Sequence, residues 1–305
     1  MVEPQAGGVT RPIRGGPPGP RIATVSVEAP PDPFVELLLR FYHEAAPFYD
    51  DWADGVHRKA AARVVQLAAV QPGELVVDAG CGTGLVANAL AAGLRSGGGV
   101  VGADLSPAML AVAQANCPAG APVTFGPGVV ENLMLRNETV DVVVLGLVLS
   151  YTVNPLAVLL EARRVLRPGG RLVVSEYQPS LRTEVDEIFQ AELRDLAEVV
   201  LRVPDPRATP RLLGEPRALR GLLSEAGYGD IRTSSMVVGN HTEDAHAFVE
   251  VMRYESPRTH ALLQVMGPGA RERLERRLSA AVRFSHDNDG FRYHRPISFA
   301  TARRD

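Results

Sequence analysis

Cysteine is almost missing from this chain of 305 residues, which contains only Cys81 and Cys117. Two cysteines exclude a disulfide scaffold, and they form no cluster with the spacing of a zinc site. We expect no metal, because no set of carboxylates and histidines has convincing ligand spacing either. Cys81 lies in a glycine-rich stretch, where we interpret it as a small filler and not as a nucleophile.

Long hydrophobic runs are missing as well. No segment approaches the roughly 18 uncharged apolar residues that a membrane-spanning helix needs. The N-terminal stretch carries Arg11 and Arg14 but lacks the apolar region of a secretion signal. We therefore expect a cytoplasmic protein with no membrane insertion.

The chain also lacks an excess of positive charge. The formal net charge is -3, and no block of basic residues stands out among the 31 arginines and the single Lys59. A nucleic-acid-binding protein needs a basic surface to neutralise phosphates. We therefore expect no nucleic-acid partner.

The composition that remains, with 46% apolar and 22% charged residues, is typical of a globular protein. Residues 1–32 are rich in proline and glycine and have almost no large apolar side chains, which predicts a disordered tail. Residues 33–305 are long enough for one large domain with added segments. We place these segments at 33–72, as N-terminal cap helices, and at 178–215 and 240–290, as helical lid insertions.

The middle of the chain alternates short apolar strands with helical patterns. This alternation predicts an α/β fold with a parallel sheet. The strands are expected at 74–79, 99–104, 122–126, 140–147 and 171–177. Ser106 before Pro107 and Asn154 before Pro155 mark two helix starts, because each pairs a good N-cap with proline at the first helical position.

Helical spacing predominates on both sides of this region. Two or three helices are expected before the first strand, with an interruption around Pro47. Later elements are predicted as a helix at 183–201, a helix at 216–226 ending at Gly227, a strand at 230–239, helices within 241–285 and a last strand within 291–304.

The stretch "VVDAGCGTGLVA", residues 76–87, reads as a strand, a glycine turn and a helix, which brings backbone N–H groups against a nucleotide-like ligand. The dinucleotide fingerprint needs glycine at position 85, where this chain has Leu85, and no lysine of a phosphate loop is near. NAD, FAD and ATP are therefore disfavoured. Asp104 ends the second strand, where a carboxylate accepts hydrogen bonds from ribose hydroxyls. Asp78 would repel a pyrophosphate and suits a ligand with a cationic end.

Five stretches together resemble one family. "VVDAGCGTG", "GADLSP", "VENL", "VDVVVLGLVLSYT" and "LRPGGRLVVSE" are similar to the class I S-adenosylmethionine-dependent methyltransferases, close to the ubiquinone and menaquinone methyltransferases. The resemblance covers about residues 42–177 and, more loosely, the rest. It implies a Rossmann-like seven-stranded sheet with the last strand antiparallel, helices on both faces and an added helical cap. The implied cofactor is S-adenosyl-L-methionine.

The resemblance also implies the cofactor contacts. Gly80, Gly82 and Gly84 would admit the methionine portion, Asp104 would hold the ribose, and Leu105 would flank the adenine. The family's third stretch carries an acidic residue where this chain has Val129, so the adenine would rely on backbone near Val130 and on Glu131. The end of the fourth strand, Leu145 to Leu147, would line the reacting centre, and Tyr49 belongs to the segment that caps the cofactor.

Methyl transfer from a sulfonium needs mainly proximity, orientation and exclusion of water. His43 is a candidate general base for a phenol or an enol, against a structural role, and Tyr151 is a candidate for contact with the acceptor. Aromatic residues near 42–52 are expected beside the sulfonium, where cation–π attraction competes with ordinary packing as their role. Further polar candidates are Glu176, His241 and His246.

These observations predict methyl transfer to O, C or N of a small lipophilic or aromatic molecule, in secondary metabolism. The added helical segments favour this acceptor class because they would build a lidded apolar pocket. The alternative is a protein that binds S-adenosylmethionine without methyl transfer, either cyclase-like or regulatory. A nicotinamide oxidoreductase is a third reading, and a homodimer stays open.

Overall fold

The computed structural model describes residues 32–94, 97–178, 183–200, 213–284 and 291–305. All of the predicted tail except Asp32 lies outside these residues, and so do parts of both predicted lid segments. None of the helices in the described ranges is long and apolar enough to cross a membrane.

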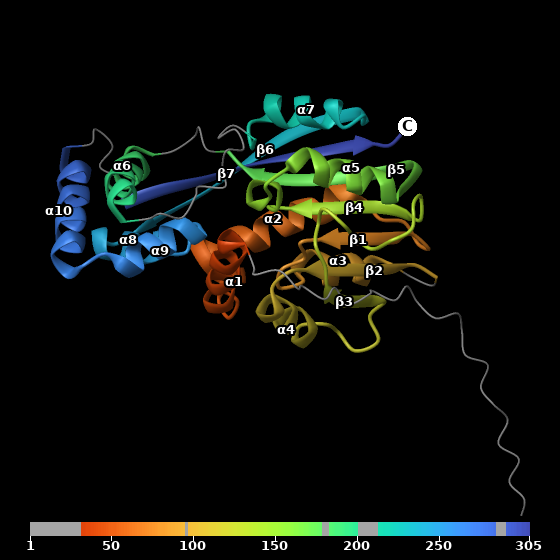
Figure 1. Ribbon diagram of the computed structural model, residues 1–305, viewed down its shortest axis with the longest axis horizontal. Coiled ribbons are helices and arrows are strands. Elements are labelled where there is room, and N and C mark those ends of the chain that lie inside the picture. The colour runs from red at the N-terminus through yellow and green to blue at the C-terminus, as the bar shows by residue number, and fades with distance from the viewer. Residues whose placement is uncertain (1–31, 95–96, 179–182, 201–212, 285–290) are drawn as a thin grey trace, which may run out of the picture.

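Seven strands form one sheet in the order β3-β2-β1-β4-β5-β7-β6 (Figure 1). The first five pair in parallel, and β7 pairs antiparallel with both β5 and β6. The strands are β1 Leu75–Ala79, β2 Gly99–Asp104, β3 Val123–Pro127, β4 Val140–Gly146, β5 Leu166–Tyr177, β6 Gly229–Thr242 and β7 Phe291–Arg303. The expected Rossmann-like sheet with an antiparallel last strand is confirmed.

The helices follow the predicted pattern closely. They are α1 Pro33–Ala45, α2 Trp52–Ala68, α3 Leu85–Gly93, α4 Pro107–Ala115, α5 Pro155–Val165, α6 Glu184–Val200, α7 Pro216–Glu225, α8 Ala245–Met252, α9 Pro257–Val265 and α10 Pro268–Phe284, with short 3-10 helices η1 Tyr49–Asp51 and η2 Leu149–Tyr151. The break near Pro47 separates α1 from η1. Ser106 and Asn154 cap α4 and α5 by accepting the N–H groups of Met109 and Ala157 at 3.3 and 3.1 Å.

Two boundaries differ from the prediction. Residues 240–242 belong to β6 and not to a helical lid, because His241 and Thr242 continue the pairing with β7; α8 starts only at Ala245. β5 begins at Leu166, which pairs with Val140 before an irregularity in the ladder. Turn residues within "LRPGG" concealed this early start from the sequence pattern.

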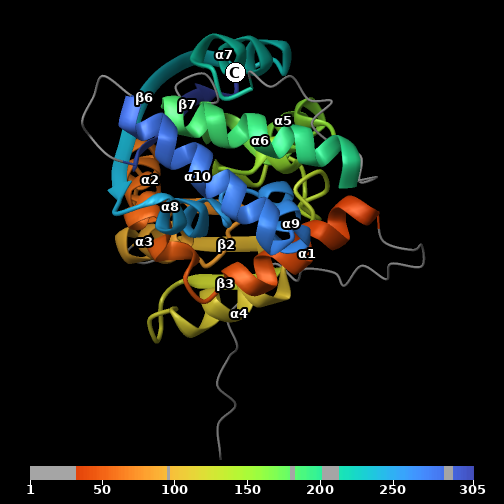
Figure 2. The same ribbon diagram turned by 90° about the vertical axis from the view of Figure 1, so that its left-hand side faces the viewer.

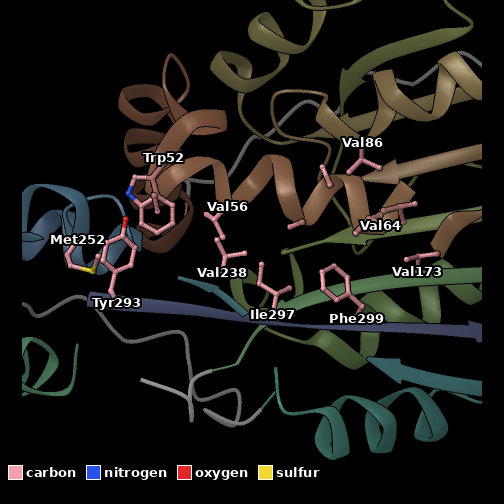
Figure 3. Packing of buried hydrophobic residues seen from close by; sticks show 14 of the residues in the cluster. Trp52, Val56, Val64, Val86, Val173, Val238, Met252, Tyr293, Ile297 and Phe299 are labelled. Atoms are coloured by element: carbon pink, nitrogen blue, oxygen red, sulfur yellow. The ribbon is translucent and has the colours of Figure 1, made fainter. Parts of the chain in front are cut away.

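Helices cover both faces of the sheet. Successive residues of β4 point to opposite faces, so Val142 and Val144 join the core under α2 and α3, while Val143 and Leu145 join the core under α5 and α7. Figure 3 shows the first core where α2 meets β6 and β7: Trp52, Val56 and Val64 face Val238, Tyr293, Ile297 and Phe299.

β6 and β7 continue as a two-stranded ribbon past the end of β5. Tyr177, the last residue of β5, pairs with Ile297, whereas the ribbon runs on to the pair Thr242 and Phe291. α6, α8, α9 and α10 pack together around this ribbon and form what we call the helical lobe (Figures 1 and 2). α1 packs against α9 of the lobe, and Trp52 at the start of α2 donates its indole N–H to the carbonyl of Val251 at 2.7 Å.

Candidate active site

The turn after β1 places three glycines in the left-handed backbone region, with φ of +77° at Gly80, +52° at Gly82 and +79° at Gly84. A Cβ atom at Gly80 would lie 2.4 Å from a methyl carbon of Val148, so close packing requires this glycine. A Cβ atom at Gly82 would meet no atom within 4 Å. Packing therefore does not explain Gly82, whose open side is available to a ligand.

Asp104 stands beside this turn at the end of β2. Its Oδ2 accepts the N–H of Gly82, and its Oδ1 accepts the N–H of Ser106, both at 2.8 Å. Burial raises the pKa of the carboxyl, and the N–H groups of Ser106, Gly82 and Leu105 oppose that rise. Each oxygen keeps a further lone pair, so the carboxylate can also accept hydrogen bonds from two ribose hydroxyls.

Asp78 lies in β1, just before the turn, and is 2% exposed. Burial is the main cause that raises its pKa to about 7; the N–H of Ala87 lowers it and the charge of Asp104 raises it further. Within the described residues its Oδ2 atom has no hydrogen-bond partner. A buried acceptor with spare capacity beside a glycine turn fits a ligand that brings an ammonium group.

The strand ends next to Asp104 expose two apolar side chains. Leu105 is 42% exposed and Val129 is 39% exposed, and the N–H of Gly128 donates to the Asp104 carbonyl at 3.1 Å, which keeps the two strand ends adjacent. Val130 packs partly into the core and Glu131 is exposed. Leu105 and Val129 together fit an apolar ring such as adenine. The roles of these four residues remain predictions.

A narrow aromatic cavity lies between the ends of β4 and β5, α1, α2 and the segment that links α8 to α9. The cavity is small, with a volume of about 10 Å³. It is lined by Phe41, Tyr42, Tyr49, His57, Leu147, Tyr151, Tyr177, Tyr254 and Glu255. The ring of Tyr42 meets those of Tyr49 and Tyr151 edge to face, with centroids 6.1 and 6.2 Å apart.

This cavity is connected to the glycine turn. Thr83 of the turn donates a hydrogen bond of 2.5 Å to Asp50 of η1, and both residues are buried. Burial raises the pKa of Tyr42 and Tyr49 well above 10, and the charge of Asp104 adds to both shifts. The tyrosine hydroxyls therefore stay protonated. A ligand in the turn and a second molecule in the cavity would be neighbours.

His57, like Tyr177 and Glu255, is a polar cavity residue that the sequence analysis missed. It is 7% exposed; its Nδ1 lies 2.6 Å from the carbonyl oxygen of Tyr49, and its Nε2 lies 3.1 Å from the hydroxyl oxygen of Tyr177. Burial lowers the pKa of His57 to about 4, and the bond to Tyr49 opposes that change. Its position within an apolar helix pattern gave no signal of this role.

The other predicted residues are divided between cavity, core and surface. Tyr49 and Tyr151 line the cavity, whereas His43 is exposed, because Tyr42 occupies the cavity-facing position next to it on α1. Of the predicted range Leu145 to Leu147, Leu147 lines the cavity, whereas the side chain of Leu145 is buried under α5 and α7 on the opposite face of β4. A cofactor contact of Leu145 stays a prediction. His241 and His246 are exposed and lie outside the cavity lining.

Glu176 is buried and not a surface carboxylate. It accepts the hydroxyl and the N–H of Ser150 at 2.5 and 3.3 Å. Burial raises its pKa to about 7, and hydrogen bonds from Ser150 and from the N–H groups of Leu149 and Val148 oppose the rise. These bonds hold η2, and with it Tyr151, at the end of β5. The described residues include no group of three or more His, Cys, Asp or Glu that is placed to hold a metal ion.

A doubly wound sheet with a glycine turn after β1, a carboxylate after β2 and an aromatic cavity beside them defines a nucleotide-dependent enzyme of the Rossmann-like class. A family model described as a methyltransferase domain matches residues 77–174. The ubiquinone/menaquinone biosynthesis C-methyltransferase UbiE of Rubrivivax gelatinosus is 35% identical over 215 residues, which cover 67% of this chain and 84% of that protein. The demethylmenaquinone methyltransferase of Tropheryma whipplei is 35% identical over 124 residues, and these cover 41% of this chain but only 49% of that protein.

The chain belongs to the class I S-adenosylmethionine-dependent methyltransferases, and S-adenosylmethionine is the cofactor of this family. Solved structures share the fold. Phosphoethanolamine N-methyltransferase 2 of Haemonchus contortus has a TM-score of 0.55 at 17% identity, covering 89% of this chain and 60% of that chain. The [4+2]-cyclase SpnF has a TM-score of 0.51 at 19% identity, covering 90% of this chain and 98% of that chain.

Proposed function

We propose that this protein transfers the methyl group of S-adenosylmethionine to a small aromatic or lipophilic acceptor, and that the acceptor binds among the cavity tyrosines by widening a cavity of about 10 Å³. The observation that carries the proposal is the hydrogen bond between Thr83 and Asp50, which joins the glycine turn to η1, the element that carries the cavity residue Tyr49. The cofactor supplies an activated methyl group when it is bound. The chain then needs to place an acceptor beside it and to exclude water.

The side chains divide this work. Asp104 would hold the ribose, and the open side of Gly82 leaves room for the methionine portion. Tyr42, Tyr49 and Tyr151 present ring faces and edges to the same space, where they favour both an aromatic acceptor and a sulfonium charge. The relatives named for quinone biosynthesis support an aromatic ring as the acceptor.

The experiment has two stages. Calorimetry with S-adenosylhomocysteine tests binding, and we expect one site per chain; no heat at millimolar ligand would contradict the proposal. Mass spectrometry of aromatic acceptors incubated with the chain and S-adenosylmethionine then tests transfer, with the mass gain of one methyl-for-hydrogen exchange as the expected result.

A second outcome is binding without transfer. The likeness to the [4+2]-cyclase SpnF, which is a likeness of fold alone, keeps this alternative in view. Binding of S-adenosylhomocysteine together with an unmethylated acceptor pool would support it. Secondary metabolism, a cytoplasmic location, a homodimer and the absence of a nucleic-acid partner stay predictions.

A further inference from the structure

β6 forms one edge of the seven-stranded sheet (Figure 2). Its pairing with β7 is continuous from Arg232 to Thr242, after a register shift between Gly229 and Arg232. An edge strand presents N–H and carbonyl groups with which another strand can pair, and proteins protect such edges with charged side chains, proline or bulges. How the outer side of β6 is protected therefore decides whether it can bind a partner.

Alternate residues of an antiparallel strand direct their backbone groups toward the paired strand and away from it. Val237 pairs with Pro296, which has no N–H group and whose carbonyl accepts the N–H of Gln178 at 2.9 Å, on the β5 side of β7. Pro296 thus makes no bond to β6, and the N–H and carbonyl of Val237 point away from β7. Because the register is unbroken, the same orientation holds for Thr233, Ser235, Gly239 and His241.

Side chains occupy outer backbone groups at both ends of this series. The guanidinium of Arg220 on α7 donates to the carbonyl of Ile231 at 2.6 Å. At the other end, the side chain of Asn240 accepts the N–H of His241 at 2.8 Å. The register shift and an ion pair of 3.1 Å within residues 230–232 protect the first end further. Pairing with another strand is therefore blocked at both ends.

The stretch between these ends, residues 233–239, is unprotected. It contains no charged residue and no proline. Within the described part of the chain, the outer backbone groups of its four outward residues have no partner outside β6; these residues are Thr233, Ser235, Val237 and Gly239. The stretch is also symmetric, because Met236 is its midpoint and the blocked residues Ile231 and His241 are equally distant from it. A strand that pairs with its own copy needs this symmetry.

We propose that β6 pairs antiparallel with β6 of a second copy of this chain, about a two-fold axis at Met236. In this register Thr233 pairs with Gly239 of the second copy, and Ser235 pairs with Val237 of the second copy. Each of these residues donates one backbone hydrogen bond and accepts one. Such a contact uses the same surface on both copies and closes after two. The two sheets join into one, and this inference goes beyond methyl transfer and does not depend on it.

The side chains are compatible with this register. The two Met236 side chains face each other across the axis, and the two Val237 side chains lie diagonally opposite each other on the other face of the sheet. Val237 is 55% exposed in the single chain, so the second copy covers an apolar side chain. Arg232 lies opposite Asn240 of the second copy, and no charged side chain of β6 is therefore placed directly opposite a like charge.

Sedimentation equilibrium of the full chain tests the proposal. We expect a dimer with a dissociation constant of about 1–100 µM, because a contact of this kind is small. Val237→Lys should raise that constant by about tenfold or more, since it places two like charges beside the axis. Val265→Lys is the matched control, because Val265 at the end of α9 is 56% exposed and should leave the dimer unchanged.

A mixture of variants tests the register. Val237→Glu alone should weaken the dimer as Val237→Lys does, whereas an equal mixture of the two variants should restore it, since a lysine of one copy then lies beside a glutamate of the other. Urea unfolding at low concentration, where the native chain is a monomer, checks that both variants fold. A folded mixture that stays monomeric contradicts the axis at Met236.

Hydrogen exchange identifies the occupant of the outer side of β6. Amide protons within residues 233–239 should exchange more slowly at high than at low chain concentration. Protection that is independent of concentration means that a segment of the same chain covers β6, and this result overturns the proposal. A chain that is monomeric at all concentrations overturns it too, and so does a dimer that Val237→Lys leaves unchanged. These measurements need no cofactor, so failure of the proposed function is a separate result.

Discussion

Oδ2 of Asp104 accepts the N–H of Gly82 at 2.8 Å, so the carboxylate at the end of β2 and the turn after β1 hold each other in place. The same carboxylate fixes Ser106 at the start of α4 through its other oxygen. One side chain thus sets the positions of two backbone segments around the space where the ribose would lie.

Replacing Asp104 by Ala should weaken the binding of S-adenosylhomocysteine by about 1.5–3 kcal/mol, the scale for hydrogen bonds to a charged group. Calorimetry measures this change directly. Asp230→Ala, an exposed carboxylate on β6, serves as the control. An unchanged affinity in a folded Asp104→Ala chain would remove Asp104 from the ribose role.

Gly82 and Gly120 form a matched pair. Both have positive φ, and an added Cβ at either would meet no atom within 4 Å, so alanine should cost each about 1 kcal/mol of unfolding free energy. Only Gly82→Ala should reduce affinity for S-adenosylhomocysteine, by about tenfold or more. Urea unfolding and calorimetry check the two effects. Equal cofactor affinity in the two variants would mean that the open side of Gly82 is not part of the site.

Gly80→Ala should behave differently, because its new methyl group would overlap the Val148 side chain. We expect a loss of about 2–4 kcal/mol in unfolding free energy from backbone strain and overpacking together. Val148→Ala in the same chain should recover the overpacking part. A double-mutant cycle by urea unfolding measures this coupling, and additive losses would show that the two positions do not collide.

The stability of the fold should depend on pH through His57. Its pKa falls from 6.5 to about 4 on folding, so the unfolded chain binds the proton first. The contribution of neutral His57 to the free energy of unfolding is therefore complete above pH 6.5. It is lost as the pH falls toward 4, and the loss amounts to about 3 kcal/mol.

Asp78 and Glu176 act in the opposite direction, since burial raises their pKa values to about 7 and their contribution falls as the pH rises toward 7. The useful measurement is thus the difference between the native chain and His57→Gln. Urea unfolding from pH 7 to pH 4 should show this difference changing by about 3 kcal/mol, with the native chain losing more. A constant difference would contradict a buried neutral histidine.

The sequence predicted the features that depend on local chemistry. The glycine turn, the carboxylate of Asp104 and the caps at Ser106 and Asn154 each follow from a few neighbouring residues, and the structure has them at the expected strand and helix ends. The antiparallel seventh strand came from the family resemblance, since the final stretch by itself only alternates like any strand.

The cavity depended on contacts that no local pattern records. His57 meets Tyr177 because three successive left-handed residues, Ala53 to Gly55, turn the start of α2 before its regular part begins. The prediction named the range Leu145 to Leu147 without separating its members, because one residue decides which face of β4 a side chain reaches. Leu147, which lines the cavity, follows the strand with a φ of +58°.

The ribbon of β6 and β7 makes the helical lobe an outgrowth of the sheet and not a separate body. Its helices are inserted into the core fold at two points of the sequence. α6 lies between β5 and α7, and α8, α9 and α10 lie between β6 and β7. Neither insertion point interrupts the segments that carry Asp78 and Asp104. Inserting or replacing sequence at these two points can therefore change the side where the acceptor would bind and leave the side where the ribose would bind intact. They are the positions at which to exchange segments in order to change the acceptor specificity of the enzyme.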